Sequence, residues 1–224
     1  MIYKREKRYW LDLTVNGVRY REPLKTGNWQ DAPKVPLVAR SRDFEAMKLQ
    51  VETMAAAKRG DAAAARAAAG RIYLLSNEPD QHPFAKQIIT LQAREAEAIA
   101  EQAAGEAGRA IAKMDEAVSI EDSIYSLSQP PYPPIPAHEL YGTMLMEMNR
   151  PADAMKQFGE ALKRTPGRPR AIYGIARAAE AAGDRQTATR RYAEFLELWN
   201  GADRDHPEIA VARRFLSLAK VASR

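Results

Sequence analysis

The chain of 224 residues contains no cysteine. This absence excludes disulfide bonds, thiolate metal sites and catalysis by a thiol. It also fits the reducing cytoplasm, where disulfides are rare, and we therefore expect a cytoplasmic location.

Long apolar runs are missing as well. No uninterrupted apolar stretch approaches the ~18 residues that indicate a membrane span. The first ten residues, MIYKREKRYW, carry charge and lack the apolar core of a secretory signal. The sequence therefore predicts a soluble protein that has no membrane partner.

Motifs of the common enzyme classes are also lacking. The chain has no phosphate loop, no Gly-x-Ser-x-Gly elbow and no glycine fingerprint of a dinucleotide site. Its three histidines lie in separate segments, and no two of them have metal-ligand spacing on one helix face. His82 and His206 each precede a proline and are expected at the surface, whereas His138 falls at a packing position. We predict no catalytic residue, no metal, no cofactor and no enzymatic activity.

Acidic residues recur at helical spacing from Glu95 to Glu101, within the sequence REAEAIAE. Such spacing is found in solvated helix faces far more often than in pairs of catalytic carboxylates. We therefore expect these side chains to lie in solvent.

The excess of positive charge is confined to one end of the chain. Residues 1–40 contain nine basic and four acidic residues, while the other 184 residues contain 25 of each. The net charge of +5 thus belongs to the first forty residues. This asymmetry indicates an attached segment with a partner of its own, and an anionic partner is the first candidate.

The N-terminal segment has the two-residue period of β-strands. Apolar and polar residues alternate in residues 9–15 and again in residues 18–22. Asn16 and Gly17 lie between the two runs and suit a two-residue hairpin turn, because both readily take positive φ angles. The pattern predicts a short β-hairpin or small β-sheet.

A segment with glycine and proline at residues 27–41 is a linker by composition. We place a domain boundary there, which gives a basic segment at 1–37 and a helical domain at 38–224. Helical patterns predict helices at about 43–59, 62–75, 84–104, 107–120, 137–148, 151–164, 168–182, 185–199 and 206–221. An irregular segment is predicted at 121–135, since prolines crowd its end.

The second half of the helical domain contains an internal repeat. Ala154 and Ala188 lie 34 residues apart, and each is followed four residues later by an aromatic residue, Phe158 or Tyr192. A large residue followed by a small one stands at the matching earlier positions, as Tyr141-Gly142 and Ile175-Ala176. Small residues allow paired helices to cross closely, and large ones fill the space between hairpins.

This pattern resembles the tetratricopeptide repeat family, whose period is 34 residues. The resemblance implies a mainly α-helical protein, built of antiparallel helix hairpins stacked as a right-handed solenoid. It places repeats near 136–166 and 168–200, more divergent repeats near 43–77 and 84–120, and a capping helix at 206–221. From His138 onward the chain is also similar to the C-terminal part of larger bacterial repeat proteins of unassigned role.

In that family the first helices of the repeats line a concave groove that binds peptides. Carried over to this chain, the groove positions are Glu139, Thr143, Met146 and Glu147 in one repeat, and Arg170, Tyr173, Arg177 and Glu180 in the next. Arg170, Tyr173 and Arg177 share a helix face. By resemblance they would grip a carboxylate of a peptide. Alternatively, the two arginines pair with Glu139, Glu147 or Glu180 across the groove.

Residues 3–32 resemble the start of the tyrosine recombinases of bacteria and phages. The basic opening, Trp10, the residues around Asn16-Gly17 and the run from Leu24 to Trp29 carry the resemblance. In that family this arm-type domain is a three-stranded sheet that binds the DNA major groove. The DNA-contact candidates are Lys4, Arg5, Lys7, Arg8, Arg19, Arg21 and Lys25.

This second resemblance covers about 30 residues. Pro33 and Pro36 replace the helix that follows the sheet in the family, and nothing downstream resembles the catalytic Arg-His-Arg-Tyr core. The segment is either a working DNA reader or a remnant, and we expect no strand cleavage.

Three hypotheses follow for the function. The first is a protein-interaction scaffold whose groove binds a peptide or partner helix. The second is a DNA-binding adaptor that holds duplex DNA through residues 1–32. The third is self-association into a homo-oligomer, because an incomplete array leaves an apolar end uncovered.

Overall fold

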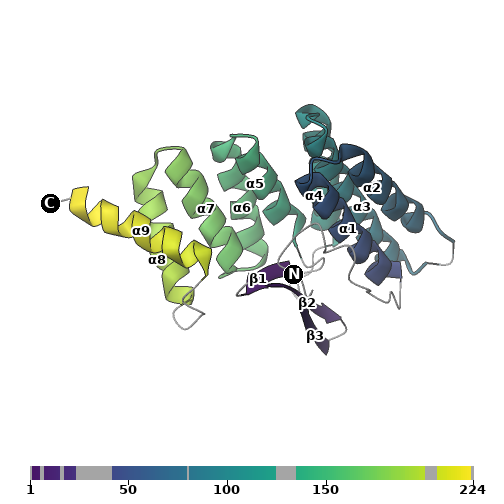
Figure 1. The fold of residues 1–224 in the computed structure, drawn as a ribbon, viewed down its shortest axis with the longest axis horizontal. Coiled ribbons are helices and arrows are strands. Elements are labelled where there is room, and N and C mark those ends of the chain that lie inside the picture. The colour runs from purple at the N-terminus through teal and green to yellow at the C-terminus, as the bar shows by residue number, and fades with distance from the viewer. Residues whose placement is uncertain are drawn as a thin grey trace. The chain divides into compact units, whose positions relative to one another are not determined.

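The computed structural model describes residues 42–79, 81–124, 135–199 and 206–222, together with the backbone of three N-terminal strands. Side chains are described for the same helical ranges as far as residue 219. The described part is mainly helical, as the sequence predicts, and contains nine helices (Figure 1). The chain divides into two compact units, residues 1–137 and residues 138–224.

The N-terminal strands are β1 (Ile2–Arg5), β2 (Arg8–Val15) and β3 (Val18–Pro23). They form an antiparallel sheet in the order β1-β2-β3. The predicted turn residues Asn16 and Gly17 lie outside the described residues, as do the predicted linker and the domain boundary near residue 38. The hairpin therefore stays a prediction.

The first unit contains four helices. They are α1 (Arg42–Lys58), α2 (Ala62–Ser76), α3 (Pro83–Ala103) and α4 (Ala107–Ile124). Glycines at positive φ end α1 and α3, with φ values of 77° at Gly60 and 79° at Gly105. The Asp61 carboxylate caps α2 by accepting a hydrogen bond of 2.9 Å from the Ala64 amide. These local signals explain why the predicted helix bounds agree closely with the observed ones.

The core of the first unit is built around α3, which packs against α1, α2 and α4. Small residues dominate this core, and alanines on all three of α1, α2 and α3 are fully buried beside Leu49 and Ile72. Alanine-rich faces allow helix axes to approach closely. Because α3 has neighbours on several sides, its buried residues are not confined to one stripe.

One predicted boundary was wrong in this unit. The irregular segment was expected to begin at Glu121, but α4 continues to Ile124. No proline lies between Glu121 and Gln129, so no helix-breaking residue ends the helix earlier. A tertiary contact also favours the extra turn, since buried Glu121 accepts a hydrogen bond of 2.8 Å from the amide of Ala137.

The second unit contains five helices, the first of which starts at the boundary between the units. They are α5 (Ala137–Glu147), α6 (Pro151–Arg164), α7 (Pro169–Ala181), α8 (Arg185–Leu198) and α9 (Pro207–Ala222). Proline occupies the first turn of α6 and α7, where its missing N–H costs nothing. Asn149, with φ of 56°, and Gly183, with φ of 79°, form the turns before α6 and α8.

Helices α5, α6 and α7 meet at Phe158. A Cβ atom added to Gly142 of α5 would lie 2.8 Å from its ring, and one added to Gly174 of α7 would lie 2.6 Å from it. The buried ring thus fills the space that two glycines leave open. The packing positions taken from the 34-residue spacing, including Ala154, Ala188 and Tyr192, are buried as well.

Candidate functional site

Three of the four predicted groove residues on α5 lie in different environments, and the fourth, Glu147, is exposed. Glu139 is only 2% exposed, and both of its carboxylate oxygens face the guanidinium of Arg168. Thr143 is exposed, and its hydroxyl donates a hydrogen bond of 3.0 Å to the carbonyl of Glu139. Met146 is half-buried. Glu139 therefore serves as an internal partner of arginine rather than as a surface group.

Two of the four predicted groove residues on α7 are exposed cations. Arg170 approaches Glu139 with Nε at 3.4 Å from a carboxylate oxygen, and its side chain is 46% exposed. Arg177 is exposed and has no carboxylate of the described residues within ion-pair distance. The pairing alternative thus accounts for Arg170 in part, whereas it gives Arg177 no described partner.

Tyr173 lies between these two arginines and joins an aromatic cluster. Its ring centroid is 5.9 Å from that of Tyr192 and 5.1 Å from that of Phe195. Burial raises the pKa of the Tyr173 hydroxyl, and the nearby Arg177 partly opposes this rise. The hydroxyl is therefore protonated at neutral pH and available as a donor.

Glu180, which was expected to face the groove, is held by this cluster. The hydroxyl of Tyr192 donates a hydrogen bond of 2.5 Å to the Glu180 carboxylate. Burial and this bond both raise the pKa of Tyr192. Tyr192 thus occupies one of the two Glu180 oxygens.

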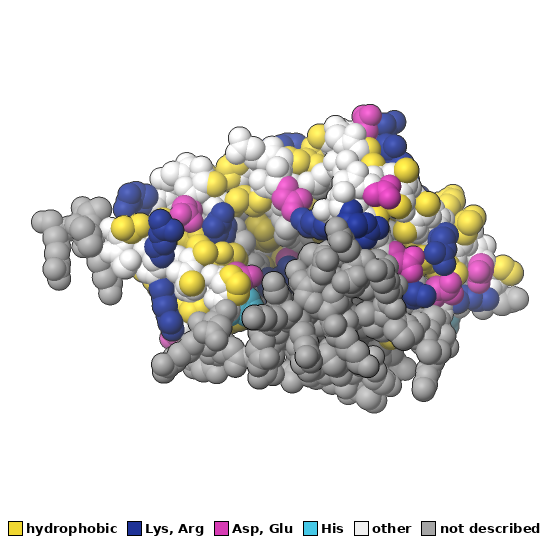
Figure 2. Space-filling model, viewed as in Figure 1, with side chains coloured by type: hydrophobic (Ala, Val, Ile, Leu, Met, Phe, Trp, Pro, Cys, Tyr) yellow, Lys and Arg dark blue, Asp and Glu magenta, His cyan; other side chains and the backbone are white. Residues whose placement is uncertain are grey.

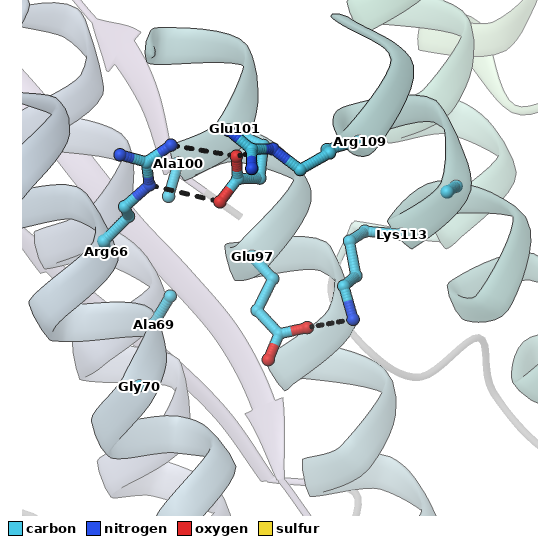
Figure 3. Close-up of a pocket in the computed structure, with 9 residues that line it drawn as sticks. Arg66, Ala69, Gly70, Glu97, Ala100, Glu101, Arg109 and Lys113 are labelled. Atoms are coloured by element: carbon cyan, nitrogen blue, oxygen red, sulfur yellow. Dashed lines mark hydrogen bonds and ion pairs between the residues drawn. The ribbon is translucent and has the colours of Figure 1, made fainter. Parts of the chain in front are cut away.

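A pocket of about 370 Å³ lies on the first unit, between α2, α3 and α4 (Figure 3). Arg66 on α2 donates to both carboxylate oxygens of Glu101 on α3, at 3.1 and 2.9 Å. Lys113 on α4 lies 3.1 Å from Glu97 on α3.

The basic and acidic side chains around the pocket neutralise one another. Arg109 also contacts Glu101, at 3.0 Å, and Arg94 also contacts Glu97, at 2.8 Å. The hydrogen bond from Arg66 is the largest cause of the lowered pKa of Glu101. Arg109 also pairs with Glu106 at 2.9 Å, and Arg94 with Glu116 at 2.6 Å. Four cations therefore face four carboxylates around the pocket, which leaves little unbalanced charge for a ligand.

The interior of the first unit contains a set of polar side chains whose burial the sequence pattern did not predict. Gln92 and Glu95 of α3 are both 0% exposed, and Gln50 of α1 and Glu121 of α4 are also buried. Gln50 Nε2 donates a hydrogen bond of 2.6 Å to Glu95 Oε2. Glu95 Oε1 and both side-chain amide atoms of Gln92 have no hydrogen-bond partner.

The expectation that the acids from Glu95 to Glu101 lie in solvent was therefore wrong for Glu95. Glu97 and Glu101 are half-buried and bind cations, whereas Glu95 faces the interior. The available signal was the composition of α3, which has apolar residues on more than one face between Ile88 and Ala100. Such a helix is buried on several sides.

The histidines have structural contacts. His82 is exposed, as expected, and its Nδ1 accepts a hydrogen bond of 3.3 Å from the Phe84 amide at the start of α3. His138 is buried, as expected, 2.7 Å from the side-chain oxygen of Gln157. His206, expected at the surface, is half-buried beside Glu208 and Trp199. In the part of the chain that the structure describes, no three acidic or histidine side chains gather where they could hold a metal ion.

The predicted DNA-contact residues, from Lys4 to Lys25, have side chains outside the described residues. On the helices, basic and acidic side chains are interspersed over the visible face rather than gathered by sign (Figure 2). None of the described helices combines the length and the apolar character needed to cross a membrane.

Comparison of the chain with models of known protein families, with curated proteins and with solved structures finds no match.

Proposed function

We propose that the protein is a non-enzymatic interaction scaffold of tetratricopeptide type. In this proposal the shared face of Arg170, Tyr173 and Arg177 binds a peptide that carries a carboxylate. The observation that carries the proposal is Arg177, an exposed arginine without a described ion-pair partner beside a half-exposed tyrosine.

The contacts of Arg170 support the same site. Glu139 already faces Arg168 through both oxygens, so the bond of 3.4 Å from Arg170 is a secondary contact. Arg170 can therefore turn toward a ligand without leaving a buried carboxylate unpaired. Arginine suits this role because its planar guanidinium binds a carboxylate through two parallel hydrogen bonds.

The test is the binding of fluorescently labelled peptide pools, followed by anisotropy. One pool carries acidic side chains and a free C-terminal carboxylate, and the other is neutral and amidated. The variant Arg170→Gln/Arg177→Gln removes two charges, and Tyr173→Phe removes only a hydroxyl. Arg185→Gln/Arg190→Gln on α8 is the matched control, because both of these arginines are exposed and the charge change is equal.

We expect the acidic pool alone to bind, and the α7 double variant to bind at least about tenfold more weakly, because each charge-assisted hydrogen bond contributes about 1.5–3 kcal/mol. The α8 double variant should bind as the unchanged protein does. Equal loss in both double variants would indicate general electrostatic attraction, and equal binding in all of them would remove the proposed site.

A second candidate is a DNA-binding adaptor without recombinase activity. The confinement of the whole net charge of +5 to residues 1–40 supports it, and so does the three-stranded order of the N-terminal sheet. Anisotropy of a labelled mixed-sequence duplex tests it, with the full chain and with residues 41–224. If the segment binds DNA, we expect the full chain to bind the duplex and residues 41–224 not to bind it. This binding should weaken steeply as the salt concentration rises. Binding that does not depend on residues 1–40 would argue against it.

A further inference from the structure

Glu95 is a carboxyl group enclosed by protein without a cation to balance it. It is 0% exposed, and it has a single hydrogen-bond donor, the Gln50 amide at 2.6 Å. Its second oxygen has no hydrogen-bond partner among the described residues. An ionised carboxylate in such a place is strongly unfavourable, because one hydrogen bond replaces only part of its hydration.

We propose that Glu95 is a proton-operated lock in the first helical unit, which holds α1, α3 and α4 together when it is protonated and loosens their packing when it ionises. The inference is independent of the proposed peptide site, because it concerns the other unit.

The groups on the surrounding helices leave the charge of Glu95 uncompensated. From α1 it is met by Gln50, which is neutral, and from α4 by Glu121, a second acid. The side chains of α2 that pack in the core beside α3 are apolar, namely Ala65, Ala69, Ile72 and Leu75.

The charged neighbours of Glu95 on α3 are engaged elsewhere. Arg94 lies 2.6 Å from Glu116, and Glu97 lies 3.1 Å from Lys113. No described cation therefore neutralises Glu95, and the only described charge that acts on it is negative.

The sign of the pH dependence follows from these contacts. Burial raises the pKa of Glu95 well above its ordinary value of 4.5, Glu121 raises it further, and the bond from Gln50 lowers it. The folded chain thus binds this proton more tightly than the unfolded chain does. The stabilisation is fully present below pH 4.5 and is lost as pH rises through the raised pKa of the folded state.

Glu121 links Glu95 to the end of α4. Its carboxylate accepts a hydrogen bond of 2.8 Å from the amide of Ala137, which joins the end of α4 to the first residue of α5. When Glu95 ionises, two negative charges face each other in the interior. We expect the packing of α3 against α1 and α4 to respond first.

The experiment uses the full chain labelled with ¹³C at the glutamate carboxyl carbons. In the unchanged protein one resonance should titrate at a pH well above that of the surface glutamates. This resonance should be absent from the Glu95→Gln variant. The thermal unfolding midpoint should fall as pH rises over the same range, and Glu95→Gln should remove that fall. Glu97→Gln, two residues away in a half-buried ion pair, is the control and should keep this fall.

Glu121→Gln provides a second variant should Glu95→Gln fail to fold. Its amide oxygen can still accept the bond from Ala137, while the negative charge is gone. The Glu95 resonance should then titrate at lower pH. A Glu95 carboxyl that titrates together with the surface glutamates in the unchanged protein would overturn the lock. The lock would also be overturned if the unfolding midpoint of Glu95→Gln had the same pH dependence as that of the unchanged protein.

Discussion

At the scale of single residues, Gln92 is an unfavourable side chain among the described residues of the first unit. It is fully buried, and neither its amide nitrogen nor its amide oxygen has a hydrogen-bond partner in the described part of the chain. Leaving a buried polar group unsatisfied costs about 1–3 kcal/mol, whereas an apolar group of similar shape has no such cost. Gln92 is therefore a position where the sequence is not optimal for stability.

We expect Gln92→Leu to raise the free energy of unfolding by about 1 kcal/mol, because it removes an unsatisfied amide. Denaturant unfolding followed by helical circular dichroism measures the change. Gln50→Leu is the matched comparison. Its amide is bound to Glu95, so this variant should lose about 1–3 kcal/mol. Loss of stability in Gln92→Leu would mean that this amide has a partner in solution.

The candidate peptide site was partly predictable at this scale. Helical spacing alone places Arg170, Tyr173 and Arg177 on one face. The spacing does not reveal that Glu139 is buried against Arg168, because that contact joins residues 29 positions apart. Whether an arginine is free to bind a ligand depends on such distant partners.

At the scale of elements, the contact of α5, α6 and α7 depends on two glycines. Both Gly142 and Gly174 lie against the Phe158 ring, and a Cβ atom on either would come within 2.8 Å of it. Glycine is usually unfavourable within a helix. Here its lack of a Cβ atom is what admits the aromatic ring.

We expect Gly174→Ala to destabilise the protein by about 1–3 kcal/mol, because overpacking forces a buried ring to shift. Gly159→Ala on α6 is the control. A Cβ atom there would meet no atom within 4 Å, and this variant should gain about 0.4–1 kcal/mol. Thermal or denaturant unfolding distinguishes the two.

Phe158→Leu in the Gly174→Ala background tests whether the Phe158 ring causes this loss of stability. The double variant should lose less stability than the sum of the two single changes, since the smaller side chain leaves room for the added methyl group. Strict additivity would show that Phe158 is not what excludes alanine at position 174.

At the scale of the whole molecule, the described helices contain two hydrophobic clusters that are separate from each other. The cluster that includes Ile72 is built from α1, α2 and α3, and the cluster that includes Ile172 is built from α7, α8 and α9. The two clusters share no residue. Damage to one core should therefore be felt first within its own unit.

We expect Ile72→Ala to lower the stability of the first unit by about 2–5 kcal/mol, because it leaves a cavity in a close-packed core. Hydrogen exchange followed by mass spectrometry should show faster exchange in α1–α4 and unchanged exchange in α7–α9. Ile172→Ala should give the reverse pattern. Faster exchange throughout the chain in either variant would indicate that the two units unfold together.

The sequence by itself determined the helices and their order. Glycines at positive φ, capping aspartates and prolines in first turns act within a few residues, so the helix bounds could be predicted closely. The spacing of 34 residues likewise indicated which side chains of α6 and α8 are buried. In both cases the signal and its effect lie on the same short stretch of chain.

Only the tertiary structure decided the environments of the polar side chains. Glu95 and Glu101 belong to one acidic pattern, yet one is enclosed beside Gln50 of α1 and the other binds Arg66 of α2. The extra turn of α4 is likewise favoured by a hydrogen bond that the Ala137 amide donates to Glu121. The physical reason is that the charge state and hydration of a side chain depend on neighbours that are distant in sequence, whereas helix formation depends on near ones.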